Sequence, residues 1–363
     1  MTHGPTESRN HGPRTHRPRA RGHRITDVFA CARCAAVLTA PVTRVALPDH
    51  AVAMCQHDFL APLLEAGTYA VDEQPSGPPR RPSFGEPGAV VLAPGDARGL
   101  VLIPDRLDGY CLGLTGCGGP NLACAGCGQP VAIRVDDCSY WQTTSLLPSA
   151  VHRMPVPGPV RAPVPWEVLG DAYEAWPPVE PIGWWDARWR AAIGAALAHL
   201  LVASEGAAVA LPPGLLTTVL GPALAGLLPP GPPTKTLTLS LAGPGLSSPG
   251  RAPDLALVPR HPQTGEVWAP PSRPGEPAGT PVPLAAEVWL HLACGRDPSR
   301  LPVTGGLPPG VERDDPLPRH PAWVFHPDWT VFHHTLTRLP KARTPWLLAL
   351  AERMAERPFL RPF

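Results

Sequence analysis

The pattern of apolar and polar residues differs between the two halves of the chain. Before about residue 145 the apolar runs are short and β-branched, and turn signals such as GDAR separate them, which predicts strands. The runs that predict these strands are DVFACARCAAVLTAPV, GAVVLAP, GLVLIPD and NLACAGCGQPVAIRVDD. One run, FLAPLLEAG, predicts a short helix that Gly67 ends. The first half is therefore expected to be β-rich.

Helical periodicity appears after residue 183. The segment WWDARWRAAIGAALAHLLVASEG predicts a helix with one apolar face, ended by Gly206. KTLTLSLAG alternates Leu with Thr or Ser and predicts a half-buried strand, as does DLALVP, whereas EVWLHLA fits either a strand or a helix. Two further helices are expected, in HPDWTVFHHTLTRL after the N-cap Asp328 and in TPWLLALAERMAE after Thr344. This order of elements predicts a small α/β or α+β domain.

Residues 207 to 228 carry no charge and are long enough to cross a bilayer. Three prolines and three glycines interrupt them, so a strand from Ala207 to Leu211 and a helix from Leu215 to Leu228 are expected instead of a transmembrane span. The sequence shows no export signal, so the cytoplasm is the expected location. Cysteines stay reduced there, and clustered thiols indicate metal or redox chemistry rather than disulfides.

Composition divides the chain further. Residues 1–26 form a basic tail with six arginines against one acid and too few apolar residues to fold, so we expect disorder. Residues 27–147 hold eight of the nine cysteines and are expected to be a zinc-binding β-rich domain, residues 148–182 carry nine prolines and predict a linker, and residues 183–363 predict a mixed α/β domain. The predicted fold class is α+β. The net charge of +1 gives no whole-chain attraction to nucleic acid or to a membrane.

Two Cys-x-x-Cys pairs carry the most specific chemistry in the sequence. Zinc prefers four soft ligands in a tetrahedron, and each pair supplies two of them with a small residue behind the second cysteine. Two such knuckles on hairpins resemble the zinc-ribbon group of domains. The resemblance implies one structural zinc site built from Cys31, Cys34, Cys124 and Cys127.

The spacing departs from that group, because 89 residues lie between Cys34 and Cys124. Closing this loop costs about 4 kcal/mol, whereas structural zinc contributes roughly 10–16 kcal/mol in small peptides. A more local set, with loops that cost about 2 kcal/mol each, consists of Cys111, Cys124, Cys127 and Cys138. We prefer the first set because the first pair otherwise lacks two ligands.

Other ligand arrangements remain open. Cys55, His50 and His57 would complete the first pair if the protein held two zinc ions, and Cys117 is unused in every scheme. Reduced cysteines without metal, and dithiol redox chemistry, are the alternatives. Redox pairs are found at helix N-termini, whereas both pairs here are flanked by strand-like runs.

No catalytic residue is identified. Walker, dinucleotide-binding, zinc-protease and nucleophile-elbow motifs are absent from the sequence, and no Glu follows His50 as a nucleobase deaminase would require. VPRHPQTGEVW places Arg260, His261 and Glu266 in one turn, which fits either a pocket or a charged loop. A cluster of His326, His333 and His334 likewise fits either a site or ordinary surface histidines.

A second resemblance covers most of the chain. GAVVLAPGDARGLVLIPDRLDGYCLG, GPNLACAGCG, DDCSYWQ and LVPRHPQTGEVW resemble a set of uncharacterised actinobacterial proteins. That resemblance implies an actinobacterial source for the protein and implies no mechanism. Two function classes follow from the sequence: a module that binds protein or nucleic acid on a surface fixed by zinc, or an enzyme whose active site lies in the C-terminal domain.

Overall fold

The structure is a computed structural model of the 363-residue chain. The residues that it describes are 25–53, 60–74, 85–107, 113–158, 162–180, 183–229, 235–247, 252–269, 279–293 and 321–356. Residues 1–24 of the expected basic tail lie outside these ranges, as do Cys55, His57 and Cys111.

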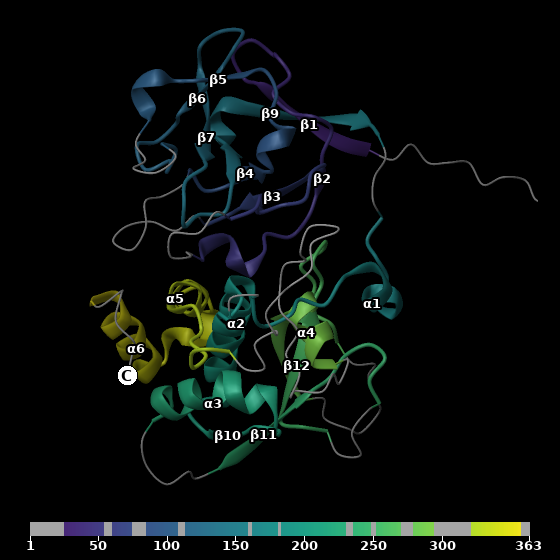
Figure 1. The fold of residues 1–363 in the computed structure, drawn as a ribbon, viewed down its shortest axis with the longest axis vertical. Coiled ribbons are helices and arrows are strands. Elements are labelled where there is room, and N and C mark those ends of the chain that lie inside the picture. The colour runs from purple at the N-terminus through teal and green to yellow at the C-terminus, as the bar shows by residue number, and fades with distance from the viewer. Residues whose placement is uncertain are drawn as a thin grey trace, which may run out of the picture.

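The N-terminal half forms two sheets, as its short β-branched runs predict (Figure 1). The larger sheet has seven strands in the order β2-β3-β4-β8-β7-β6-β5. Its strands are β2 (Thr43–Arg44), β3 (Thr68–Asp72), β4 (Ala89–Leu92), β5 (Leu100–Leu102), β6 (Leu122–Cys124), β7 (Pro130–Val135) and β8 (Thr143–Leu146). All neighbours in it are antiparallel except β2 and β3. The second sheet is the antiparallel pair of β1 (Ile25–Cys31) and β9 (Val151–Pro157).

The C-terminal half contains a four-stranded sheet in which every strand is parallel to its neighbours. Its strands are β10 (Ala208–Ala210), β11 (Thr236–Leu241), β12 (Leu255–Arg260) and β13 (Thr280–Ala285). The α-helices are α1 (Leu169–Ala172), α2 (Ala187–Ser204), α3 (Leu215–Leu227), α4 (Ala286–Ala293), α5 (Trp329–Leu336) and α6 (Pro345–Glu356). A mainly antiparallel half followed by a parallel one makes the whole chain α+β.

Helix α2 is the centre of the C-terminal core. The side chain of Asp186 accepts hydrogen bonds from the backbone N–H groups of Arg188 and Trp189, which fixes the start of the helix. Trp189 and Ile193 are fully buried, and the alanines on the other side of the helix are buried as well. The helix is therefore covered on all sides rather than on one face. Its last residue is Ser204, and the C-cap Glu205 and the expected Gly206 follow with left-handed φ values of 51° and 84°.

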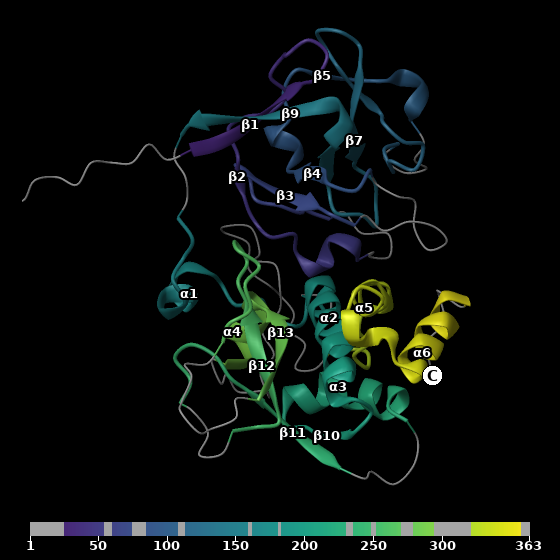
Figure 2. The same cartoon turned by 180° about the vertical axis from the view of Figure 1, so that it is seen from behind.

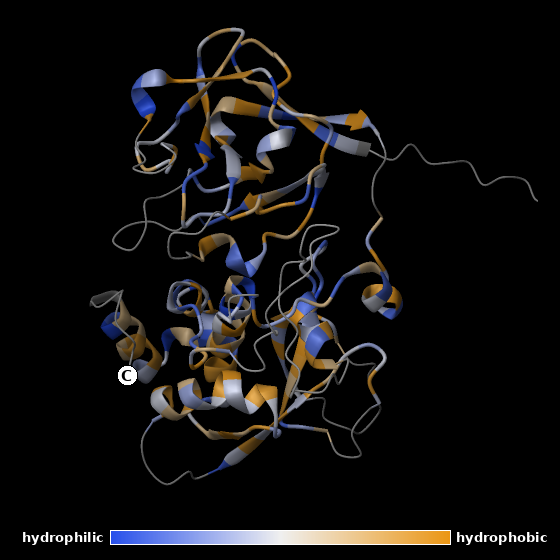
Figure 3. Ribbon diagram, in the orientation of Figure 1, coloured by the Kyte–Doolittle hydropathy of each residue, from blue (hydrophilic) through white to orange (hydrophobic). Residues whose placement is uncertain are grey.

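The uncharged stretch 207–228 divides as predicted into β10 and α3. The residues of α3 that the structure buries are Leu216, Val219, Leu220, Ala223, Leu224 and Leu227, the face that the helical period predicts. Figure 3 shows apolar residues on α3 and on β12, both of which belong to this core. In the part of the chain described here, no helix has the length and apolarity needed to cross a membrane.

One expectation about local structure was wrong, and the structure specifies two others more closely. FLAPLLEAG forms no helix in its described part; instead Pro62 bridges to Gln142 beside the large sheet. EVWLHLA is the helix α4. The predicted linker 148–182 contains strand β9, whose prolines are tolerated because, among the residues described, β1 is the one strand that pairs with β9 and its other edge has no strand.

The two halves meet at a short 3-10 helix, Asp49–Val52, which lies on α2 in both views (Figures 1 and 2). Val52 and Ala53 pack with Ala191 and Ala195 of α2. An ion pair of 2.7 Å joins Asp49 to Arg260 at the end of β12. The contact between the halves is therefore partly apolar and partly ionic.

Candidate metal centre

Each Cys-x-x-Cys pair begins at the last residue of a strand. Cys31 ends β1 and Cys124 ends β6. In the first loop the N–H of Cys31 donates to the carbonyl of Ala36, and the N–H of Ala35 donates back to the carbonyl of Cys31. The second loop repeats this arrangement, with Cys124 bonded to Gln129 and Gly128 bonded to Cys124. The two loops are therefore the same turn built twice.

The residue after the second cysteine adopts a left-handed backbone in both loops. Gly128 has a φ of 71° and Ala35 has a φ of 59°. Glycine accepts this conformation without strain, whereas an alanine there costs about 1–2 kcal/mol. The first loop therefore carries backbone strain that the second avoids.

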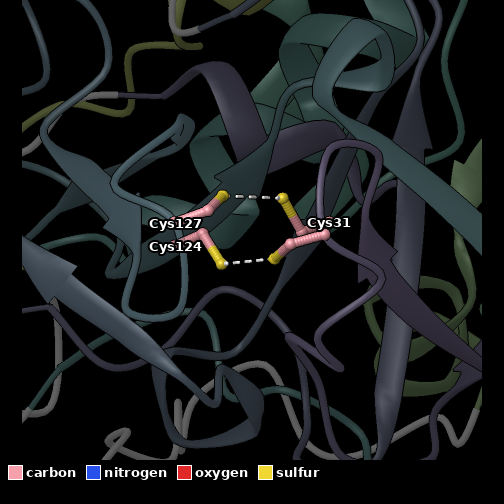
Figure 4. A group of neighbouring side chains, drawn as sticks. Cys31, Cys124 and Cys127 are labelled. Atoms are coloured by element: carbon pink, nitrogen blue, oxygen red, sulfur yellow. Dashed lines mark hydrogen bonds between the residues drawn. The ribbon is translucent and has the colours of Figure 1, made fainter.

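The two loops bring four sulfur atoms together at one point (Figure 4). The sulfurs of Cys31, Cys34, Cys124 and Cys127 all lie within 4.8 Å of one another. Cys31 is 3.6 Å from Cys127, and Cys34 is 3.6 Å from Cys124. These distances exclude a disulfide, which needs about 2.05 Å. They are close to the ~3.8 Å that separates sulfurs on a tetrahedral zinc with bonds of about 2.3 Å.

Backbone amides help to hold negative charge at this cluster. Burial raises the pKa of Cys31, but hydrogen bonds from the backbone N–H groups of Arg33 and Cys34 outweigh burial and lower the pKa to about 7. For Cys34, the backbone N–H of Ala36 lowers the pKa, and hydrogen bonds with the thiols of Cys127 and Cys124 raise it to about 12. Hydrogen bonds between thiols join Cys31 to Cys127 and Cys34 to Cys124, and a bound cation would displace the thiol protons.

The cluster lies where the two N-terminal sheets meet. Cys31 and Cys124 are fully buried and belong to the same apolar core as Phe29 and Ile133, whereas Cys34 is exposed. Backbone hydrogen bonds tie each loop to a residue that precedes another strand: the N–H of Ala32 donates to the carbonyl of Ala150 before β9, and the N–H of Ala125 donates to the carbonyl of Gly99 before β5. Ligands from both sheets therefore converge on one point at the surface.

Of the remaining candidate ligands, those that the structure describes do not join this cluster. Cys117 is exposed and Cys138 is half-buried, and neither belongs to the group of four. Cys111 of the local set lies outside the described residues, as do Cys55 and His57. His50 is buried where the two halves meet, with its ring 4.7 Å from that of Trp141.

The chemistry of the donors fits a structural metal ion. Four thiols fill a tetrahedron and leave no position for water or substrate, which distinguishes structural zinc sites from catalytic ones. A redox-active dithiol pair is typically found at a helix N-terminus, whereas both pairs here follow strands. The arrangement can hold a soft divalent cation and offers no open coordination site.

Sequence patterns missed a second group of polar residues, which lies between the two halves. It contains His50, Arg188, Arg260 and Glu287, all of which line one cavity. The turn VPRHPQTGEVW was the one signal for it, and Arg260 and His261 do line that cavity. Arg188 and Glu287 lie on helices, and the periodic pattern of a helix predicts which residues are buried but not which residues line a cavity. No local sequence signal therefore identifies these two as cavity residues.

Comparison of the chain with protein-family models, with curated proteins and with solved structures found no match. The resemblance to actinobacterial proteins therefore remains a prediction. The site has to be interpreted from its own geometry.

The strained turn at Ala35 can be tested by substitution. Ala35→Gly should raise the free energy of unfolding by about 0.5–1 kcal/mol. Glycine removes the strain of a left-handed alanine from the folded state, and this gain exceeds the cost of the greater conformational entropy of glycine in the unfolded chain. Gly128→Ala should lower the free energy of unfolding by about 1 kcal/mol, since a Cβ at Gly128 meets no atom within 4 Å and the backbone alone is perturbed. Urea unfolding of the metal-loaded protein measures both. Destabilisation by Ala35→Gly would contradict the shared turn geometry.

Proposed function

We propose that this protein binds one zinc ion through Cys31, Cys34, Cys124 and Cys127, and that the ion is structural. The observation that carries the proposal is the convergence, within 4.8 Å, of four sulfurs from two cysteine pairs that 89 residues separate in the sequence. A thiol-only ligand set favours zinc over calcium or magnesium, which prefer oxygen ligands. The proposed site joins the ends of β1 and β6 in the manner of a zinc ribbon with a long insertion.

We further propose that the N-terminal domain is a binding module and that its partner is a protein. The exposed surface beside the knuckles is formed by edge strand β5, where Val101 and Leu102 are about half exposed. Leu100 of the same strand pairs with Cys124, so this edge lies next to the proposed zinc. An unpaired apolar edge strand is a common docking element for an extended segment of another protein.

The charges beside the knuckles do not favour nucleic acid. Binding to phosphates requires several free cationic side chains on one face. Arg134 is paired with Asp136 at 2.8 Å, Arg106 donates to the carbonyl of Gly118, and Arg98 donates to the carbonyl of Ala97. Of the described arginines near the cysteines, Arg33 alone is exposed without such a bond. The second hypothesis, an enzyme with its site in the C-terminal domain, has one supporting observation, the charged cavity that this domain helps to line.

Native mass spectrometry tests the zinc proposal directly. The wild-type protein should carry one zinc ion, and Cys31→Ser and Cys127→Ser should each lose it, because each removes one of four ligands. Cys117→Ser is the matched control, since this cysteine is exposed and outside the cluster, and it should retain the metal. Retention of zinc by Cys31→Ser together with its loss in Cys127→Ser would instead favour the local set with Cys111 and Cys138.

Site-specific photo-crosslinking in cells tests the protein-binding role. A photoreactive amino acid at Leu102 should yield protein adducts that are absent when it replaces Leu348, an exposed leucine on α6. The adducts should disappear in Cys31→Ser, because loss of zinc disorders the edge beside it. Adducts that nuclease removes, or equal adducts at both positions, would contradict a protein partner at β5.

A further inference from the structure

A cavity of about 190 Å³ lies where the two halves of the chain meet. Its walls come from residues 43–50 and 63–68 on one side and from α2, the end of β12 and the start of α4 on the other. The cavity is partly open to solvent. A second hollow of about 1320 Å³ has His50, Arg188 and Glu287 in its lining as well.

Two arginines face this cavity with donor groups to spare. The Nε and Nη2 groups of Arg188 donate to Asp186, and its guanidinium lies 4.5 Å from the ring centroid of Trp176. Arg260 contacts Asp49 through Nη2 at 2.7 Å. Among the described residues, nothing pairs with Nη1 of Arg188 or with the remaining N–H groups of Arg260. Each guanidinium can therefore donate to a ligand without losing its carboxylate.

His50 lies between them as a neutral polar group. It is 6% exposed, and its ring contacts those of Trp141 and Trp176. Burial, together with the charges of Arg188 and Arg260, lowers the pKa of His50 to about 3. No hydrogen bond to its ring nitrogens is found within the described ranges, so the imidazole has one donor and one acceptor free.

The acids of the cavity leave both guanidinium groups with donors for a ligand. Asp49 is paired with Arg260 and Asp186 with Arg188, and Glu65 is exposed at the rim. Burial raises the pKa of Glu287, against the opposing effect of Arg260 and Arg188, which favours its protonated form. The attraction for an anion therefore comes from hydrogen bonds donated by the free N–H groups and not from an excess of positive charge.

The rest of the lining is apolar or aromatic. Leu47, Leu63, Leu64 and Ala192 form apolar walls, the ring of Trp176 lies beside Arg188, and Tyr173 lines the same cavity. Small-molecule sites combine an apolar cavity with a few converging polar groups in this way. The pattern calls for a compact molecule with a planar apolar body and an anionic end.

We propose that this cavity binds a small organic carboxylate with a planar apolar body. The carboxylate accepts hydrogen bonds from the free N–H groups of Arg260 and Arg188, His50 supplies a neutral hydrogen bond, and the body packs against Trp176 and the leucines. The site lies outside the cysteine cluster and contains no cysteine, so it stands independently of the zinc proposal.

Isothermal titration of the full-length, metal-loaded protein with three probes tests the proposal. Benzoate, benzamide and benzamidine share one ring and size and differ in charge. Benzoate should bind, and benzamide should bind about tenfold more weakly, the effect of losing one charge-assisted hydrogen bond. Tighter binding of benzamidine, equal binding of benzamide, or no heat from benzoate at millimolar concentration would overturn the proposal.

Variants locate the binding to this cavity. Arg260→Gln should weaken benzoate about tenfold, and Arg343→Gln, the same change at an exposed arginine outside the cavity, should leave it unchanged. Arg188→Gln removes the other guanidinium of the cavity and should weaken benzoate to a similar extent, so the test survives if Arg260→Gln does not fold. Unchanged benzoate affinity in either folded variant would place binding elsewhere.

Discussion

The meeting of four sulfur atoms from two distant turns is the constraint on which the N-terminal half depends. Cys31 stands at the end of β1 and Cys124 at the end of β6, in different sheets. Bringing these ends together closes a loop of 89 residues at a cost of about 4 kcal/mol. The strands β2 to β5 inside that loop are part of the same seven-stranded sheet as β6. Strand pairing and the proposed metal therefore both offset the entropy cost of closing the loop.

The sequence predicts the local parts of this structure well because their signals are local. The face of α3, the Asp328 cap of α5, the alternation of β11 and the two cysteine turns follow from spacing within a few residues. The small residue that follows each pair also predicts a tight turn. In such a turn backbone N–H groups point at the sulfurs, as they do at Cys31 and Cys34.

Features that depend on distant pairing escape the same analysis. Strand β9 contains Pro155 and Pro157, and its composition alone indicates a linker; pairing with β1 makes it a strand. Strands β4 and β5 are consecutive in the chain and are not neighbours in the sheet, which no local turn signal reveals. The cavity around His50 requires Asp49 and Arg260 to meet from opposite halves, so its residues carry no shared motif.

X-ray absorption at the zinc edge of the purified protein tests the central claim most directly. The structure predicts four sulfur neighbours at about 2.3 Å and no nitrogen or oxygen in the first shell. A shell that contains histidine nitrogen or water oxygen would contradict a closed centre of Cys31, Cys34, Cys124 and Cys127. Absence of stoichiometric zinc from protein purified without chelator would contradict the metal itself.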